Sequence, residues 1–246
     1  MTSSLAAVII GNEILSGRRR DAHLANTISA CHARGLRLGE VVYLGDDSAA
    51  LVATFRRLHA QGASILSFGG IGATPDDKTR QAVAEALGVP LAYHREGLAI
   101  LDARFGDALT ENRRRLVHFP QGATLIPNPV NQIPGFSIAD IHCVPGFPQM
   151  AEPMIAWALD SHCRHLAAER FYCALLAHLP ESEAVPLIDR LEARYPALGI
   201  SSLPQIRLCT ELGFEGPQAQ ALAARRDAAQ WLADAGIAHE LLDAAP

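Results

Sequence analysis

The chain has 246 residues, a formal net charge of -5, 49% hydrophobic residues and 19% charged residues. This length suits one large α/β domain, or a medium domain followed by a small one, and the composition is that of a well-packed protein rather than a disordered one. The negative charge excludes the electrostatic footprint of nucleic-acid binding. No segment is long and apolar enough to span a bilayer. We therefore expect neither nucleic acid nor membrane as a partner.

The cysteines and the N-terminal residues indicate the cellular compartment of the protein. The five cysteines are odd in number and form no CxxC pair, so reduced thiols are the simplest interpretation. The N-terminus lacks a basic region followed by an apolar signal core. We predict a cytoplasmic protein.

The first part of the chain alternates short apolar runs with helical segments. The predicted elements are strands over Leu5–Ile10, Arg37–Leu44 and Ala63–Phe68, and helices starting near Asp21, spanning about Ala49–Gln61, and spanning Arg80–Leu87 with Gly88 as C-cap. Short strands in this β-α-β-α-β-α order indicate a parallel sheet, in which ligands gather at the carboxyl ends of the strands.

The stretch from Gly69 to Thr79 places a glycine-rich turn and two carboxylates at such a strand end. A strand, a glycine turn and a helix N-terminus together make an anion site, because backbone amides can face the ligand closely. Asp76 and Asp77 would repel a phosphate there. A divalent cation such as Mg²⁺ between carboxylate and phosphate removes this conflict. The stretch therefore predicts a metal-assisted phosphate site.

Simpler interpretations of this stretch exist. Thr74 or Asp76 can cap the following helix while the glycines form a turn. Capping uses one of these residues and leaves the other carboxylate without a role, so we favour the site. Lys78 is either a phosphate contact or a solvent-facing residue of the first helical turn.

Two further loops are expected near this site. Gly11 to Gly17 forms the loop leaving the first strand, at the same edge of the sheet. The Pro-Gly turn at Pro145 opens a helix running to about Leu166, and its backbone amides offer a third wall for a ligand. A simple strand-to-helix turn explains that dipeptide equally well.

The rest of the chain indicates edge strands and then a second domain. Phe119–Val130 predicts edge strands and turns, and Gly135–Ile138 with Ile141–Val144 predicts a hairpin. The pattern changes near Ala167. Residues 1–166 are expected to form one domain, and residues 167–246 a small two-layer α+β domain of split-βαβ, ferredoxin- or KH-like, pattern in the order β-α-β-β-α-β.

A histidine-rich segment is a weaker candidate site. His162, Cys163 and His165 are spaced for a shared helix face, which makes a zinc site conceivable. A further ligand at a recognisable spacing is missing, so a solvated helix end is the better interpretation.

Four motifs together resemble one known family. They are the Gly11–Gly17 loop, the Gly69–Thr79 loop, Gly122–Gly135 with its Pro-Asn-Pro and Pro-Gly-Phe triplets, and Pro145–Pro148. They are similar to the molybdopterin-binding superfamily of molybdenum-cofactor biosynthesis proteins. The closest likeness is to the amino-terminal domain of competence/damage-inducible protein A and to the related domain of eukaryotic FAD synthetase. Across residues 1–166 this resemblance implies a three-layer α/β sandwich around a mainly parallel sheet, frequent homo-oligomers, and a site that takes a nucleotide or pterin with a divalent metal.

The resemblance also assigns residues. Asp77 matches the aspartate of the family's Gly-Gly-x-Gly-x-x-x-x-Asp-x-Thr motif, and Glu13 matches the acid of its Gly-Asp-Glu-Ile loop. We expect Asp77, Asp76 and Glu13 to be catalytic, with both aspartates holding Mg²⁺ or another divalent metal. The expected ligand-binding residues lie on the same motifs: Gly11, Asn12, Ser16, Gly17, Gly69, Gly70, Gly72, Thr74, Lys78, Thr79, Asn128, Pro145, Gly146 and Pro148.

Two departures from the family pattern bear on function. The cofactor-biosynthesis members usually carry arginine where this chain has Asp76, and aspartate where it has Asn12. Both departures favour the competence branch, whose domain looks like a metal-dependent nucleotide pyrophosphatase acting on ADP-ribose-like compounds.

Three functions remain open. The leading hypothesis is an enzyme that hydrolyses the pyrophosphate of an ADP-ribose- or FAD-like compound. The second is a molybdopterin-binding protein of molybdenum-cofactor biosynthesis. The third is a non-catalytic nucleotide- or pterin-binding regulatory module.

Overall fold

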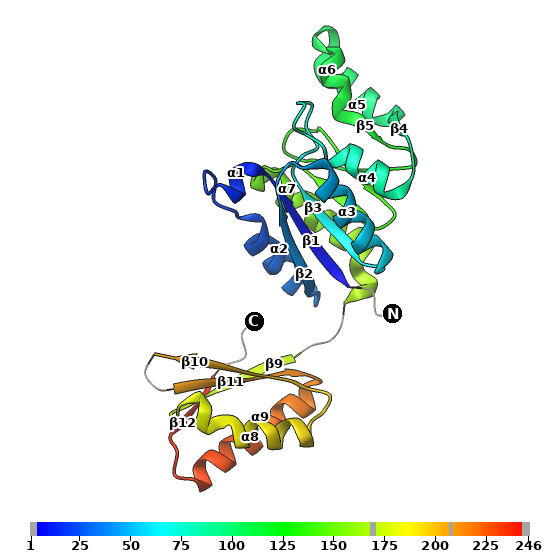
Figure 1. The fold of residues 1–246 in the computed structure, drawn as a ribbon. Coiled ribbons are helices and arrows are strands. Elements are labelled where there is room, and N and C mark those ends of the chain that lie inside the picture. Colours follow the sequence, from blue (N-terminus) through cyan, green and yellow to red (C-terminus); the bar gives the residue numbers. More distant parts are fainter. Residues whose placement is uncertain (1–3, 168–170, 207–208, 243–246) are drawn as a thin grey trace. The chain divides into compact units, whose positions relative to one another are not determined.

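The structure is a computed structural model that describes residues 4–167, 171–206 and 209–242 (Figure 1). The chain divides into two compact units, Met1–Ala167 and Ala168–Pro246, and each has its own sheet and core. The first is an α/β sandwich around a mainly parallel sheet, and the second carries an antiparallel sheet. The predicted fold class is thereby confirmed.

The sheet of the first unit has the order β2-β1-β3-β8-β7-β6. These strands are β1 (Leu5–Ile10), β2 (Leu38–Leu44), β3 (Ser64–Phe68), β6 (Thr124–Ile126), β7 (Gly135–Ile138) and β8 (Ile141–Val144). The four strands β2, β1, β3 and β8 run parallel, while β7 and β6 form the antiparallel edge. The carboxyl ends of β1, β3 and β8 therefore meet at one edge, where Ile9 pairs with Phe68 and Phe68 with Val144.

Helices cover both faces of this sheet (Figure 1). Helices α3 (Ser48–Ala60) and α4 (Thr79–Leu87) cover one face, and α2 (His23–His32) and α7 (Pro148–Ala158) cover the other. The remaining helices of this unit are α1 (Asn12–Leu15), α5 (Arg95–Phe105) and α6 (Glu111–Arg114). Side chains alternate between the two faces of a strand, so β1 feeds two cores. Val8 packs with α3 and α4, and Ile9 packs with α2 and α7. A separate two-stranded sheet, β4 (Leu91–Tyr93) with β5 (His118–Pro120), extends beside α4 and α5.

Two predicted segments differ from the structure. The loop after β1 contains the short helix α1, because Gly11 accepts from the amides of Ile14 and Leu15. The helix predicted to reach Leu166 is regular only to Ala158. It continues as a π turn, Leu159–Cys163, and a 3₁₀ turn, Arg164–Leu166.

The second unit has the predicted element order. It comprises β9 (Phe171–Ala177), α8 (Glu181–Arg194), β10 (Gly199–Gln205), β11 (Cys209–Gly216), α9 (Gln218–Asp234) and β12 (His239–Leu242). Its antiparallel sheet has the order β10-β11-β9-β12, with both helices packed on one face around Leu175, Leu212 and Phe214. None of the helices in the described parts of the chain is long and apolar enough to cross a membrane.

The histidine-rich segment after α7 packs against β8. Cys163 is buried in the core, and the His162 ring stacks on His142 with 4.9 Å between ring centroids. His142 is 1% exposed, and its Nδ1 lies 2.8 Å from the Ser137 hydroxyl. The described residues contain no group of three or more histidine, cysteine or acidic side chains placed to hold a metal. The expectation of a solvated helix end is wrong for Cys163, because it belongs to the apolar core beneath the sheet.

The buried His142 predicts a pH-dependent stability. Burial, assisted by the neighbouring His162, lowers the pKa of His142 from 6.5 to about 4. The unfolded chain then binds a proton that the folded chain excludes, so the contribution of His142 to stability is fully present above pH 6.5 and is lost between pH 6.5 and 4, by up to ~3 kcal/mol. We expect His142→Asn to flatten this decline in urea denaturation series. The control His165→Asn changes an exposed ring and should keep it. An equally steep fall in stability with falling pH in wild type and His142→Asn would contradict the assignment of this effect to His142.

Candidate functional site

Three loops meet at the carboxyl edge of the parallel strands. The loop after β3 and the loop after β8 touch directly, because Gly69 N donates to Val144 O at 3.0 Å. A Cβ on Gly146 would lie 3.3 Å from Gly69 Cα, so the two backbones approach closely. The loop after β1 is tied to the end of β2, where Gly11 N donates to Leu44 O at 3.0 Å.

The glycines after β3 are required by the start of α4. Thr79 is fully buried; its hydroxyl donates to Gly69 O at 2.9 Å and its amide donates to Gly70 O at 3.0 Å. Gly70 has φ 67°, and a Cβ there would lie 2.2 Å from Thr79 Oγ1. A side chain at Gly70 is therefore excluded both by conformation and by space.

Asp77 closes the glycine loop. Its Oδ2 accepts from Thr74 N at 2.9 Å and also from the Thr74 hydroxyl. A Cβ on Gly72 would lie 2.5 Å from the same oxygen, so the loop backbone packs tightly against this carboxylate. Helix α4 begins at Thr79 with Lys78 in the N-cap position. The alternative in which Thr74 or Asp76 caps the helix is therefore wrong, because no side chain makes a capping hydrogen bond to α4 and Thr74 pairs with Asp77 instead.

A cavity of about 400 Å³ lies beside this loop. The segment from Gly70 to Thr74 and the carboxylate of Asp77 contribute to its lining. The rest of the lining is mainly apolar and is formed by Leu116, Asn131, Ile133, Pro134, Pro145, Gly146, Phe147 and Met150. The arrangement suits a ligand with an anionic end and a flat or apolar end.

The structure brings part of the predicted site to this cavity. Gly70, Gly72, Thr74, Asp77, Pro145 and Gly146 line it. Gly69 and Thr79 hold the loop from behind, and Pro148 begins α7. Asp76 is exposed and is not among the lining residues; hydrogen bonding from Thr74 and from its own amide lowers its pKa.

Other predicted residues have structural partners. Lys78 Nζ donates to Asp46 O at 2.9 Å, which ties α4 to the turn before α3. Asn128 is buried; its Oδ1 accepts from Val130 N at 3.0 Å, and its Nδ2 donates to Ile133 O at 3.0 Å. Asn128 therefore shapes the loop that supplies Asn131 and Ile133 to the cavity wall.

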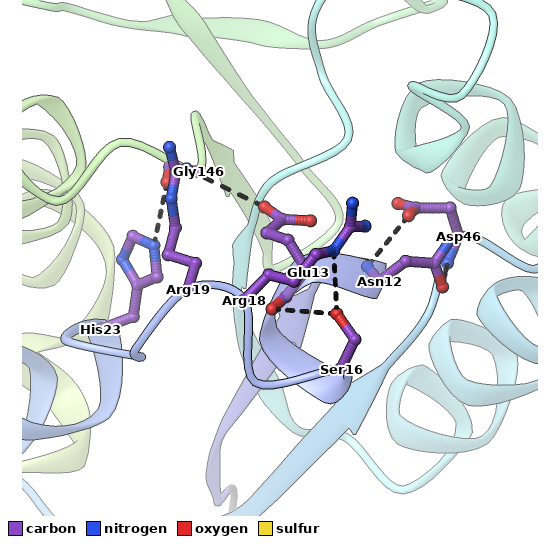
Figure 2. Close-up of polar contacts among 8 residues, drawn as sticks. All are labelled: Asn12, Glu13, Ser16, Arg18, Arg19, His23, Asp46 and Gly146. Atoms are coloured by element: carbon purple, nitrogen blue, oxygen red, sulfur yellow. Dashed lines mark hydrogen bonds and ion pairs between the residues drawn. The ribbon is translucent and has the colours of Figure 1, made fainter.

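The loop after β1 forms its own polar network, which Figure 2 shows. Asn12 N donates to Asp46 Oδ2 at 3.1 Å, and Glu13 pairs with Arg19 at 3.8 Å. Ser16 accepts from Arg18 Nε at 3.2 Å, and Gly17 closes the turn at φ 72°. Glu13 is thus held beside the strand edge rather than in the cavity wall.

Two basic side chains lie near the site but were not identified as site residues from the sequence. His23 is buried, and its Nε2 lies 3.3 Å from Gly146 O (Figure 2). Its ring packs in a tilted arrangement against Phe68, with 4.7 Å between the ring centroids. Burial lowers the pKa of His23, so the ring favours the neutral form.

Arg80 is the second. It is 3% exposed and donates from Nη2 to Gly72 O, whereas its Nε and Nη1 find no partner among the described residues. Burial lowers its pKa, and the charge of Asp77 opposes that effect. The one sequence signal was its place in the first turn of α4, where a cation opposes the helix dipole.

Comparisons with known proteins identify the family. Residues 6–165 match the MoCF_biosynth family, described as "Probable molybdopterin binding domain". The chain belongs to this molybdopterin-binding family. The family match covers all of the first sheet except Leu5, and every loop around the cavity.

Individual relatives of the family support the likeness. A CinA-like protein from Anaeromyxobacter is 35% identical over 145 residues, which cover 56% of this chain and 35% of that protein. This chain thus matches about a third of that relative's length. A protein from Pyrobaculum calidifontis is 26% identical over 208 residues, covering 80% of this chain and 79% of its own. The crystal structure of CinA from Thermoplasma acidophilum, titled as of unknown function, has 24% identity and a TM-score of 0.59, and covers 68% of this chain and all of its own. That likeness establishes the fold.

The glycine loop yields a stability prediction with a matched control. Gly70→Ala adds a methyl group against buried Thr79 as well as left-handed strain, whereas Gly88→Ala adds only the strain, since Gly88 has φ 69° and open space. We expect Gly88→Ala to cost ~1 kcal/mol and Gly70→Ala ~1–3 kcal/mol more, measured by chemical denaturation. Equal losses would show that Thr79 does not press on Gly70.

Proposed function

We propose that this chain binds a nucleotide diphosphate together with a divalent metal and hydrolyses its pyrophosphate bond, with ADP-ribose- and FAD-like compounds as substrates. One observation carries the proposal: Asp77 lines a cavity of about 400 Å³, beside the glycine loop and the start of α4. The cavity size suits a small ligand. Family membership supports a small-molecule ligand of nucleotide or pterin type.

The loop and its surroundings favour a phosphate beside Asp77. Gly70 and Gly72 line the cavity without side chains, so a phosphate can approach their backbone closely. The positive end of the α4 dipole lies behind them. The buried Arg80 cation donates to Gly72 O, and its incomplete pairing leaves positive charge behind the loop.

The carboxylates fit Mg²⁺ better than a metal that needs an all-protein cage. Asp77 Oδ2 is engaged by Thr74, and its Oδ1 accepts no hydrogen bond from the described residues. These residues include no cluster of three or more potential ligands. Mg²⁺ typically takes one or two carboxylates together with substrate phosphates and water. When bound, Mg²⁺ would polarise the phosphoryl group and lower the pKa of a bound water.

The remaining predicted catalytic groups have assigned roles in this proposal. Glu13 would hold the attacking water or complete the metal shell from the neighbouring loop, after leaving its 3.8 Å contact with Arg19. Asp76 would act as a second acidic group near the metal, without a direct place in the cavity wall.

Binding of molybdopterin is the second candidate. It is favoured by the family description and by the mainly apolar wall, against which a pterin ring can lie. Mass spectrometry of ligands released from gently purified protein separates the candidates. An adenine nucleotide supports the first, and a pterin supports the second.

Substitution of Asp77 tests the enzyme proposal. Asp77→Asn keeps the side-chain shape but removes the charge that the cation requires, so we expect at least ~100-fold slower turnover. The assay is Mg²⁺- or Mn²⁺-dependent release of AMP from ADP-ribose and FAD, followed by chromatography with EDTA as control. Exposed Asp76→Asn is the matched variant and should lose less activity.

The outcomes separate an enzyme from a binder. If wild-type protein binds nucleotide yet releases no AMP with any divalent metal, the hydrolase proposal is wrong, and a non-catalytic binding module replaces it. Unchanged activity in Asp77→Asn would instead show that Asp77 does not bind the metal. Loss of activity in Asp76→Asn as large as in Asp77→Asn would assign both aspartates to the metal.

We also propose a homo-oligomer, from the resemblance to the family and the 49% hydrophobic content. Light scattering at micromolar concentration measures it. A monomer throughout that range would contradict it.

A further inference from the structure

Phe147 is an exposed aromatic residue on the wall of the cavity. Its side chain is 53% exposed, and it lies between Gly146 and the first residue of α7. Its backbone is fixed, because its carbonyl accepts from the amides of Met150 and Ala151, each at 2.9 Å. A rigid backbone thus presents a largely bare phenyl ring to the cavity, and leaving that ring in water is unfavourable unless a ligand covers it.

The lining of the cavity around Phe147 combines apolar and polar groups. The apolar side chains of Leu116, Ile133, Pro134 and Met150 line the same cavity, and so do the segment from Gly70 to Thr74 and Asp77. A cavity of about 400 Å³ holds a small molecule rather than a protein segment. Its occupant therefore needs an apolar or flat part at Phe147 and an oxygen-rich part at Asp77.

Arg19 lies against the same ring. Its Cζ is 5.6 Å from the Phe147 ring centroid, and its Nη1 is 3.8 Å from Glu13. Figure 2 shows Arg19, which belongs to the segment before α2, paired with Glu13. A guanidinium beside an aromatic face favours stacking of electron-rich rings. Since Phe147 stays more than half exposed, Arg19 leaves room for a second planar group.

We propose that Phe147 is the stacking platform for a planar heteroaromatic ring of the ligand, with Arg19 as its cationic neighbour. The ring is a purine or a pterin, and the phosphate groups attached to it extend toward Gly70 and Asp77. The proposal rests on the proposed function, because it concerns the same cavity. It adds the direction in which the ligand lies and makes Phe147 a determinant of specificity for ring-bearing compounds.

Titration calorimetry with ring-bearing and ring-free ligands tests the platform. The probes are ADP-ribose, a hydroxymethylpterin, inorganic pyrophosphate and ribose 5-phosphate, each with Mg²⁺. We expect Phe147→Ala to weaken the ring-bearing ligand that binds wild type by ~10-fold or more, and to leave pyrophosphate affinity unchanged. Phe147→Tyr should retain the wild-type affinity. The control Tyr93→Ala removes an aromatic ring that stacks on His118 outside the cavity wall, and should change none of these affinities.

The outcomes distinguish this inference from the function on which it rests. If wild type binds ADP-ribose or the pterin and Phe147→Ala binds it equally well, the platform is wrong and the proposed ligand class stands. An equal loss for pyrophosphate would overturn the stacking role, because the substitution would then disturb the whole site. If wild type binds neither ring-bearing ligand, both proposals are overturned. A lower mass of Phe147→Ala in light scattering, with ligand affinity unchanged, would assign Phe147 to contact with a second copy of the chain.

Discussion

The candidate site depends on the close approach of Thr79 to the glycines that follow β3. The Thr79 hydroxyl and amide hold the carbonyl groups of Gly69 and Gly70, and space for a side chain at Gly70 is absent. This contact fixes where α4 begins relative to the sheet. It therefore fixes the direction of the helix dipole and the place of Asp77, which lies two residues before Thr79 in the same turn. The remainder of the cavity is arranged around that turn.

Charged side chains of both signs lie around this turn. Asp77 is held by Thr74, and Arg80 sits behind the loop with part of its guanidinium unpaired. A buried cation without a full set of partners is costly, and a nearby negative charge reduces that cost. The carboxylate of Asp77 supplies part of this negative charge. A diphosphate and a divalent metal that bind together would bring negative and positive charge to this turn. Neither Asp77 nor Arg80 would then lack a partner of opposite charge.

Local sequence patterns predicted the elements that carry the site. The apolar run Leu5–Ile10, the helix over about Ala49–Gln61 and the glycine C-cap at Gly88 follow from periodicity and backbone chemistry, and the structure has each of them, the helix as Ser48–Ala60. Contacts between distant segments were not predictable in this way. The sequence offers Lys78 as a possible phosphate contact. In the structure its ammonium group donates to the Asp46 carbonyl, because α4 packs close to the turn before α3. Leu116 and Asn131 line the cavity, but they belong to segments whose path depends on tertiary packing. The only sequence feature that distinguishes Arg80 is its positive charge in the first turn of α4, where it opposes the helix dipole.

We propose that nucleotide and metal meet at Asp77. A crystal structure of the full chain grown with ADP-ribose and Mn²⁺, with the metal located by anomalous scattering, tests this proposal. We expect an anomalous peak bound to Asp77, with the diphosphate against Gly70 and Gly72. A metal and nucleotide found together at another place on the protein, with the Asp77 cavity empty, would contradict it.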